Sequence, residues 1–335
     1  MSGRASGRRW LRLLQFLLGF GVVLGLAKLA GPVSVFFENR KLPDGWRILR
    51  PPHEVSALAL QGNLLWAGGT DGLWAIGRES GGFARLPRLP RITAVRDLAV
   101  TETGAVWVAH REGLTRISDG AARTWTSAGG LQDGALTALC PMPDGRLWIG
   151  GESGLSVLEG DSFRRVADTA QLGIEGVDVI YPDEGGALWL ASMAPLRGGL
   201  LRYDGSRFEN WTGRPQFAHP AVNAILRSRD GTLWFGAGFG RRGGASAWKD
   251  GAWRMITKEG GLAGEKVRSL FEDRKGRLWI GSEYDGIAVF DGSRSRILTP
   301  AQGLSGWEVK EMVEDGRGVL WLATEDGITR IERFE

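Results

Sequence analysis

Three arginines stand in two inserted segments of an otherwise regular sequence, and they are the first candidates for a chemical role. Arg197 lies in Ser192–Gly199 (SMAPLRGG), whereas Arg241 and Arg242 lie in Gly238–Gly244 (GFGRRGG). A guanidinium group donates parallel hydrogen bonds to carboxylates, sulfates and phosphates, so three of them on neighbouring loops would suit an anionic ligand. Solvated loop arginines without a ligand are the competing interpretation.

Aromatic and ionisable side chains occur at equivalent loop positions elsewhere in the chain. Tyr284 and Trp307, if exposed, would suit stacking on a sugar ring, and a core-covering role for Trp307 is the alternative. The other candidates at these positions are His110, Arg111, Glu112, Glu152, His219, Glu265, Glu283, Glu325 and Asp326. Together these residues predict a binding surface for an anionic or carbohydrate ligand.

The three histidines, His53, His110 and His219, are the natural candidates for a metal ligand or a general base. No two of them share a metal-ligand spacing, and no base, metal ligand and acid stand at a recognisable spacing. Cys140 is the single cysteine, so neither an intramolecular disulfide nor a cysteine metal cluster is available. The sequence therefore predicts no catalytic residue, no metal and no cofactor.

A repeat positions all of these candidates. One tryptophan recurs in the same local setting with spacings of 41, 41, 41, 45, 45 and 42 residues, at Trp66, Trp107, Trp148, Trp189, Trp234, Trp279 and Trp321. An aliphatic residue precedes it by about twelve positions, and glycine or asparagine stands three positions before it, as a hairpin turn requires. The residue two positions after it is always glycine or alanine, which predicts the close approach of another backbone or ring.

Each repeat accommodates four short antiparallel strands, the unit of a β-propeller blade. Seven copies over residues 44–335 predict an all-β, seven-bladed propeller with the tryptophans packed between blades. The last copy lacks a fourth strand, whereas residues 45–50 resemble one and precede the first copy. We therefore expect residues 45–50 to be the outer strand of the last blade, closing the ring.

The turns between second and third strands and the blade-to-blade connections share one face of such a propeller, which we call the loop face. Both inserted segments fall between second and third strands, so they are expected as adjacent long loops on this face. All the candidate residues named above map to the same face.

Charge is unevenly distributed along the chain. Five of the 42 basic residues and no acidic residue lie in residues 1–30, which leaves 37 basic and 38 acidic residues in the rest. The net charge of +4 therefore belongs to the N-terminus. The predicted propeller has no basic excess that would attract nucleic acid, so no nucleic-acid partner is expected.

Residues 11–30 (LRLLQFLLGFGVVLGLAKLA) form an apolar run long enough for a helix to cross a bilayer. Four arginines precede or open it, so residues 1–10 are expected in the cytoplasm, 11–30 as an inner-membrane signal anchor, 31–43 as a linker and the propeller in the periplasm. A cleaved signal peptide, which would release the propeller as a secreted protein, is the alternative. The short linker predicts that the loop face points away from the membrane.

The sixth copy resembles the two-component regulator propeller repeat in its segment Val267–Ser282 (VRSLFEDRKGRLWIGS), preceded by Gly261-Leu262. Val309–Thr324, preceded by Gly303-Leu304, resembles it too, and the likeness extends over nearly everything after residue 43. The resemblance implies an extracytoplasmic sensor module of the kind that commonly precedes a membrane helix and a histidine kinase. This sequence ends directly after the last copy, so a separate histidine kinase or envelope protein is the expected partner.

These observations predict a membrane-anchored binding or sensing propeller, not an enzyme, that recognises a small polar ligand or a protein partner on its loop face. The glycine-x-leucine-tryptophan rhythm is also similar to that of the virginiamycin B lyases, which are seven-bladed propeller enzymes. A lyase-type enzyme and a structural envelope scaffold are therefore the alternatives.

Overall fold

The computed structural model describes residues 41–84, 89–90, 92–131, 135–214, 216–292 and 294–335. Asp44–Glu335 form one compact unit. The expected cytoplasmic segment 1–10, the expected anchor 11–30 and all but the last three residues of the expected linker lie outside the described residues. Of the helices in the described part, none combines the length and the apolarity that crossing a membrane requires.

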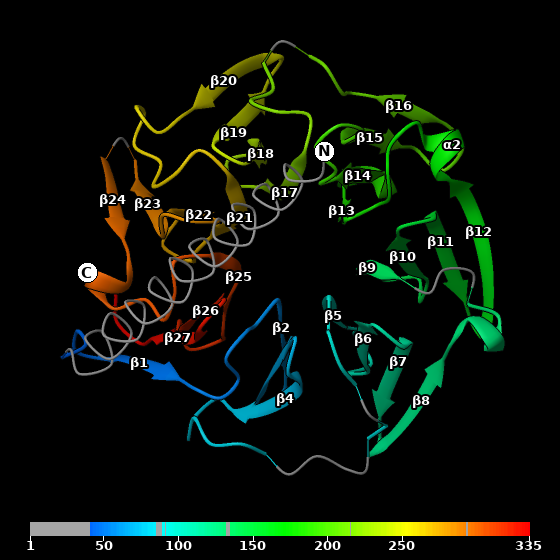
Figure 1. The fold of residues 1–335 in the computed structure, drawn as a ribbon, viewed down its shortest axis with the longest axis horizontal. Coiled ribbons are helices and arrows are strands. Elements are labelled where there is room, and N and C mark those ends of the chain that lie inside the picture. The colour runs from blue at the N-terminus through cyan, green and yellow to red at the C-terminus, as the bar shows by residue number, and fades with distance from the viewer. Residues whose placement is uncertain (1–40, 85–88, 91, 132–134, 215, 293) are drawn as a thin grey trace, which may run out of the picture. The chain divides into compact units, whose positions relative to one another are not determined.

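Residues 44–335 fold into seven antiparallel sheets arranged radially (Figure 1), which confirms the predicted seven-bladed propeller. The strands of the first three blades are β2 (Ala57–Gln61), β3 (Leu64–Gly69) and β4 (Gly72–Gly77); β5 (Asp97–Val100), β6 (Val106–His110), β7 (Gly113–Ser118) and β8 (Ala121–Trp125); and β9 (Leu136–Pro141), β10 (Leu147–Gly151), β11 (Gly154–Glu159) and β12 (Ser162–Asp168). The strands of the fourth and fifth blades are β13 (Val179–Pro182), β14 (Leu188–Ser192), β15 (Gly199–Tyr203) and β16 (Phe208–Asn210); and β17 (Val222–Arg227), β18 (Leu233–Phe239), β19 (Arg242–Lys249) and β20 (Ala252–Ile256). Those of the last two are β21 (Val267–Glu272), β22 (Leu278–Ser282), β23 (Ile287–Asp291) and β24 (Arg294–Leu298); and β25 (Val309–Glu314), β26 (Leu320–Thr324), β27 (Gly327–Ile331) and β1 (Trp46–Leu49).

The first blade differs from the other six in its outermost strand. Its sheet has the order β2-β3-β4, and a single bridge between Ile76 and Phe83 marks the place where a fourth strand runs in the other blades. Residues 85–88, which follow, lie outside the described residues. Four strands per blade is therefore confirmed for six of the seven blades.

The two ends of the propeller meet in the last blade. β1 pairs antiparallel with β27, from Trp46 opposite Ile331 to Leu49 opposite Ile328. The indole nitrogen of Trp46 also donates to the carbonyl of Arg333, 3.1 Å away. This pairing confirms that the N-terminal strand supplies the outer strand of the last blade and closes the ring.

The repeated tryptophans pack between blades, as predicted. Trp189 of the fourth blade shares a cluster with Leu233 and Phe235 of the fifth, and Trp321 of the last blade packs with Leu65 of the first. Trp189, Trp279 and Trp321 are almost fully buried. Because each blade hides its faces against its neighbours, the ring is held together by these shared cores.

Short helices interrupt the connections between blades: α2 (Thr169–Leu172), η1 (Ser127–Gly129) and η3 (Pro300–Gln302), with η2 (Glu184–Gly186) in the turn between β13 and β14. Asp168 caps α2 by accepting from the backbone N–H of Gln171 at 2.9 Å. The innermost strands of the seven blades surround the centre of the ring (Figure 1): β2, β5, β9, β13, β17, β21 and β25.

Candidate functional site: the mouth of the central channel

At the loop face, a buried aliphatic residue stands either at the start of each innermost strand or two positions before it, and the residue that directly follows it lies near the centre of the ring. These seven positions, which we call the mouth ring, are Ser56, Arg96, Thr137, Asp178, Asn223, Arg268 and Lys310. In four strands the pairing with the second strand shifts at this residue, so that Thr137, Asn223, Arg268 and Lys310 are bulged. A β-bulge redirects the side chain that it carries, and bulges are common beside binding and active sites.

A cavity of about 430 Å³ opens at this mouth. The mouth ring contributes Ser56, Arg96, Thr137, Asp178 and Arg268 to its lining. His110, at the end of β6, and Arg111, Glu152 and Met193, in the turns that follow second strands, also line it. The volume lies in the range of small-molecule sites in proteins. Charged side chains of both signs therefore surround a space large enough for a small ligand.

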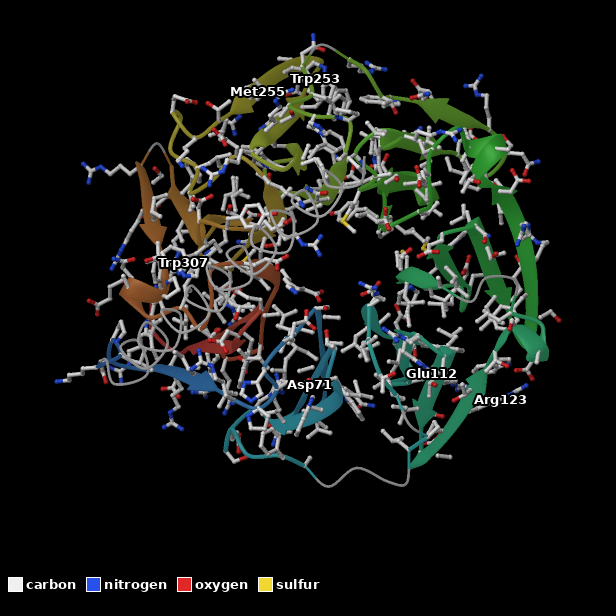
Figure 2. All side chains as sticks on the ribbon, in the orientation of Figure 1. Asp71, Glu112, Arg123, Trp253, Met255 and Trp307 are labelled. Atoms are coloured by element: carbon white, nitrogen blue, oxygen red, sulfur yellow. The ribbon has the colours of Figure 1, made fainter. Side chains whose placement is uncertain are left out.

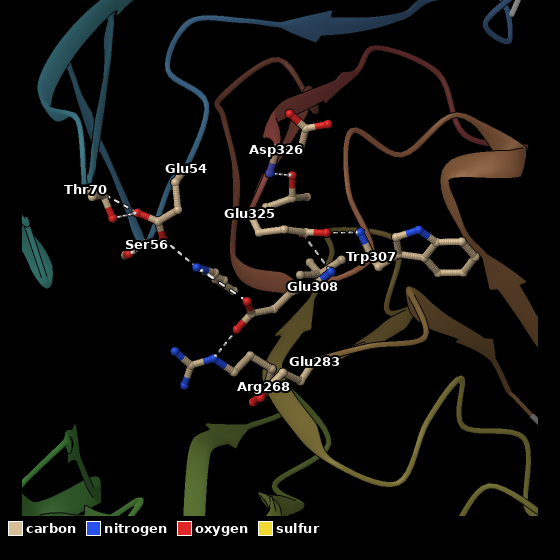
Figure 3. Close-up of polar contacts among 12 residues, drawn as sticks. Glu54, Ser56, Thr70, Arg268, Glu283, Trp307, Glu308, Glu325 and Asp326 are labelled. Carbon is tan, nitrogen blue, oxygen red and sulfur yellow. Dashed lines mark hydrogen bonds and ion pairs between the residues drawn. The ribbon is translucent and has the colours of Figure 1, made fainter. Parts of the chain in front are cut away.

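Ion pairs occupy one half of the mouth (Figure 3). Glu308 accepts from Nε of Arg268 at 3.0 Å and lies 3.4 Å from Nζ of Lys310, which also pairs with Glu54. Glu54 in turn accepts from the backbone N–H of Thr70 at 2.6 Å. Burial acts to raise the pKa of Glu54, but hydrogen bonds from Lys310 and Thr70 outweigh it and lower the pKa to about 2. The charges in this half are therefore balanced by ion pairs within the protein.

The other half carries charged side chains that form no ion pair with the described residues. Within the described part of the chain, Arg96, Arg111 and Glu152 have no ion-pair or side-chain hydrogen-bond partner, and all three are exposed. Asp178 is held in place by the backbone N–H of Met193, which donates to Oδ2 at 2.8 Å. Burial raises the pKa of Asp178, the charge of Glu152 raises it further, and Arg268 and Arg96 oppose the increase.

Two carboxyl groups lie deeper along the inner strands. Asp97 accepts from the backbone N–H groups of Leu98 and Leu139, at 2.7 and 2.6 Å, and Glu311 accepts from that of Leu58 at 2.7 Å. These bonds satisfy N–H groups on strand edges that face the channel and have no neighbouring strand. Burial raises the pKa of Asp97 to about 7, and burial together with the charge of Asp97 raises that of Glu311.

The inserted segments place the three predicted arginines on the loop face but outside the lining of the mouth cavity. Arg197 is exposed in the loop between β14 and β15, where its carbonyl accepts from Glu175 N–H at 2.9 Å. The expectation of a long loop over Gly238–Gly244 is wrong. The hairpin continues instead until Phe239 pairs with Arg242, and Arg241 lies in the tight turn.

Glycine explains the extended hairpin of the fifth blade. A Cβ atom on Gly243 would lie 2.6 Å from Cα of Gly238, so the strands approach too closely for side chains. Gly240 in the turn has φ +59°, a left-handed conformation. The insertion therefore lengthens β18 and β19 instead of forming a separate loop, and no described contact brings Arg197 together with the two arginines of this hairpin.

The histidines occupy different environments. His110 is the last residue of β6 and not a loop residue as expected; it is 1% exposed, with Nδ1 2.9 Å from Glu112 Oε2 and Nε2 2.7 Å from Thr115 Oγ1. His219 is half-buried and accepts from the N–H of Ala221 at 3.0 Å. Burial lowers its pKa, and Arg242 and Lys266 lower it further. His53 is exposed on the same face.

Tyr284 and Trp307 lie on neighbouring loops, because the N–H of Gly286 donates to the carbonyl of Trp307 at 2.8 Å. Both rings are exposed, Tyr284 at 55% and Trp307 at 42%. The Trp307 ring extends away from the ion pairs of the mouth (Figure 3). Figure 2 shows the places of Trp307 and Glu112 in the whole propeller. The exposure of Trp307 favours the stacking interpretation over a core-covering role.

The remaining candidates fall into two groups. Arg111 and Glu152 line the cavity, whereas Glu265 is half-buried outside its lining. The other acidic candidates are tied to protein groups: Glu112 to Thr93 and His110, Glu283 to Lys266, Glu325 to the N–H groups of Trp307 and Glu308, and Asp326 to Arg50.

Sequence reasoning overlooked the mouth ring. Arg96, Asp178, Arg268 and Lys310 were not among the candidates, although each directly follows the aliphatic residue that marks the start of a repeat. That position changes from serine to arginine, threonine, aspartate, asparagine and lysine between repeats that otherwise keep their pattern. A variable polar residue inside an invariant setting was the available signal.

Comparison with known proteins places this geometry in context. Residues 261–284 match the family model described as the two component regulator propeller. No curated protein matches the sequence of the chain.

Several solved structures are similar in fold. The extracellular domain of the putative hybrid two component system BT3049 from B. thetaiotaomicron has a TM-score of 0.74 and 18% identity, over 86% of this chain and 41% of that chain. That of the putative one component system BT4673 from the same organism has a TM-score of 0.66 and 16% identity, over 85% and 40% of the two chains. Virginiamycin B lyase from Staphylococcus aureus, solved as a catalytically inactive variant with quinupristin, has a TM-score of 0.65 and 15% identity, over 86% and 99%. The chain thus spans about two fifths of each of these two extracellular domains, and at these identities the likeness establishes the fold alone.

Proposed function

We propose that the chain is an extracytoplasmic sensing or binding module that recognises a small polar ligand at the mouth ring. The match of residues 261–284 to the two component regulator propeller supports this role. The observation that carries the proposal is the cavity of about 430 Å³ lined by Arg96, Arg111, Glu152 and Asp178. Charged side chains without a protein partner retain their capacity to bind a ligand. The fold similarity to extracellular domains of two-component and one-component systems supports a sensing role.

The mouth ring is a better candidate than the predicted arginine rim. Arg197, Arg241 and Arg242 are exposed side chains that line no part of the cavity. Arg96 and Arg111 are exposed as well, but they line one cavity together with Glu152 and Asp178, so a single small ligand could contact several charged groups at once. We therefore place ligand recognition at the channel mouth.

The cellular setting completes the proposal. Residues 11–30 would anchor the chain in the inner membrane and place the propeller in the periplasm, where a separate histidine kinase or an envelope protein would receive the signal. Ligand binding without catalysis is proposed, because both nitrogens of His110 already have partners within the protein. The likeness to virginiamycin B lyase concerns the fold.

A protein partner on the same face is the second candidate function. Leu196, Phe239, Tyr284 and Trp307 are large apolar side chains exposed on the loop face, and Leu196 is 92% exposed. They belong to the fourth, fifth and sixth blades and to the connection into the last blade. Exposed aromatic and aliphatic side chains on one face are typical of protein-binding surfaces.

Thermal unfolding of the full chain with a panel of sugars, dicarboxylates and amino acids tests ligand recognition. A compound that binds the folded state raises Tm. We expect Arg96→Ala to weaken the binding of such a compound by about tenfold or more, because a charge-assisted hydrogen bond is lost. Arg241→Ala, which also removes an arginine from the loop face, is the control and should leave the affinity unchanged. Loss of affinity in Arg241→Ala alone would move the site to the rim.

A further inference from the structure

The charges around the mouth cavity are separated by sign. Arg96 and Arg111 come from the second blade, where Arg96 N–H donates to the carbonyl of Ala109 at 2.8 Å and Arg111 N–H donates to that of Thr93 at 3.2 Å. These two bonds set the arginines at adjacent strand ends of one sheet. One wall of the cavity is therefore basic.

The acidic wall comes from the next two blades. Glu152 follows the second strand of the third blade, and Asp178 precedes the first strand of the fourth. The Val177 N–H donates to the carbonyl of Gly151 at 3.0 Å, so the residues adjacent to these two acids are joined directly. The charge of Glu152 also raises the pKa of Asp178, as expected for two carboxyl groups at close range.

Neither wall is closed by an ion pair in the described part of the chain, although Arg268 and Arg96 act on Asp178 at longer range. Across the described residues, no ion pair reaches Arg96, Arg111, Glu152 or Asp178. Arg268, the other cation of the lining, already pairs with Glu308 and lies 3.0 Å from the sulfur of Met193. The bond from Met193 N–H uses Oδ2 of Asp178 and leaves Oδ1 without a partner among the described residues.

We propose that the mouth cavity binds a small zwitterion of amino-acid to dipeptide size, with its carboxylate on Arg96 and Arg111 and its ammonium group on Glu152 and Asp178. This inference rests on the proposed function and names its ligand class. A simple anion would match one wall and be repelled by the other, and a neutral sugar would leave both walls unneutralised. A zwitterion matches both walls, and a dipeptide fits a cavity of about 430 Å³.

Calorimetric titration of the full chain with L-alanine and L-alanyl-L-alanine tests the proposal. N-acetyl-L-alanyl-L-alanine lacks the ammonium group, and L-alanyl-L-alanine amide lacks the carboxylate. We expect either the amino acid or the dipeptide to bind, and the matching blocked derivatives to bind about tenfold more weakly or worse. Equal binding of the N-acetylated compound would overturn the proposal.

Two variants assign each end of the ligand to a wall. Blocking the carboxylate of the dipeptide should reduce its affinity for Arg96→Gln less than its affinity for the wild type. Blocking the ammonium group should likewise reduce the affinity for Glu152→Gln less than that for the wild type. Both residues are exposed, so both variants are expected to fold, and their Tm values check this. Arg241→Gln is the control. If the penalties for blocking either end are the same in all variants, the assignment is wrong.

Titration with succinate and maltose separates this inference from the proposed function. Binding of either compound that Arg96→Gln weakens, without binding of L-alanine or L-alanyl-L-alanine, would retain a ligand site at the mouth and overturn the zwitterion. If none of the four compounds binds in a way that depends on Arg96 or Glu152, both the zwitterion and the mouth site fail.

Discussion

Several of the repeated tryptophans pair an apolar ring with a buried hydrogen bond. Nε1 of Trp279 donates to Asp273 Oδ2 at 2.9 Å, and Nε1 of Trp234 donates to Ser228 Oγ at 3.0 Å. The acceptor in both cases stands in the turn six residues earlier, so the ring fixes the hairpin as well as the core between blades. Phenylalanine would fill much of the same volume but would leave the turn residue without its donor.

The small residues two positions after the tryptophans are required by the neighbouring blade. A Cβ atom on Gly236 would lie 2.5 Å from Cγ1 of Val267, and one on Gly150 would lie 2.2 Å from the carbonyl oxygen of Val177. The clash is with the next blade in both cases, with β21 for Gly236 and with the residue two positions before β13 for Gly150. A side chain here would push two blades apart.

Gly236→Ala is therefore expected to destabilise the propeller by about 1–3 kcal/mol, because the added methyl group overpacks a rigid contact between blades. Gly316→Ala is the matched control, since a Cβ atom there meets nothing within 4 Å and its φ is not in the left-handed region. Urea denaturation of the two variants measures the difference. Equal free energies of unfolding would mean that the fifth and sixth blades can move apart without cost.

At the scale of elements, the closing strand matters more than its length suggests. β1 has four residues, yet it covers the edge of β27 that would otherwise be unpaired. Arg50, just after β1, donates from Nε to the carbonyl of Asp326 at 2.7 Å and forms an ion pair with its carboxylate. The closing strand is thus attached to the last blade by backbone and side-chain bonds.

Trp46→Ala is expected to loosen the ring closure, because Trp46 is buried and its indole nitrogen bonds Arg333. The loss of a buried tryptophan should cost about 3 kcal/mol or more. Hydrogen exchange should rise both in β1 and in β25–β27, at opposite ends of the sequence.

Trp253→Ala is the control for the closing strand. Trp253 lies on β20, an outer strand of the fifth blade that does not join the chain ends (Figure 2). Its ring contacts Phe217, Phe235 and Trp248, so its substitution should raise exchange in the fifth blade and in the connection that precedes it, but not in β1 or β25–β27. A rise confined to β1 in Trp46→Ala would show that the last blade holds together without its fourth strand.

The repeat allowed the sheets to be predicted, but not the exact course of the inner strands. Turn glycines, aliphatic positions and tryptophans each depend on local geometry, and they located seven blades and the closing strand correctly. The bulges at Thr137, Asn223, Arg268 and Lys310 add one residue on one strand only, and hydrophobic spacing does not record which residue is bulged. Arg268 and Lys310 were overlooked for this reason, whereas Arg96 and Asp178 precede their strands, at positions that the hydrophobic pattern does not define.

The inserted segment of the fifth blade shows the same limit. The extra residues between its second and third strands predicted a loop, yet its four glycines allow β18 and β19 to approach closely and continue pairing. His110 was predicted as a loop residue because it follows the second strand in the repeat. In the structure it is the last residue of that strand, and Glu112 and Thr115 occupy both of its nitrogens.

At the scale of the whole molecule, the central channel concentrates carboxyl groups whose pKa values move in opposite directions. Lys310 and Thr70 lower the pKa of Glu54 to about 2, against the effect of burial. Deeper in the channel, burial raises the pKa of Asp97 to about 7 and also raises that of Glu311. Glu54 therefore contributes stability that is lost as pH falls below about 4.5. The raised pKa values of Asp97 and Glu311 instead make the folded state less stable as pH rises.

The sign follows from proton binding. Between about pH 4 and pH 7, the folded chain keeps a proton on Asp97 that the unfolded chain has released, and the raised pKa of Glu311 acts in the same direction. Stability falls with rising pH wherever the folded state binds more protons. We therefore expect Tm to fall by about 2–5 °C between pH 5 and pH 8, because the unfolded chain releases protons that the folded chain holds.

Glu311→Gln should reduce this fall to less than half. The amide oxygen can still accept from Leu58 N–H, while the raised pKa of Glu311, to which burial and the charge of Asp97 contribute, no longer acts on stability. Glu314→Gln is the control, because Glu314 lies at the other end of β25 and pairs with Arg274 at 3.1 Å, so its variant should keep the wild-type slope. Calorimetric Tm values at pH 5 and pH 8 decide the matter. An unchanged slope in Glu311→Gln would mean that the two channel carboxyl groups ionise independently, and that the inner strands do not couple the first, second and last blades through charge.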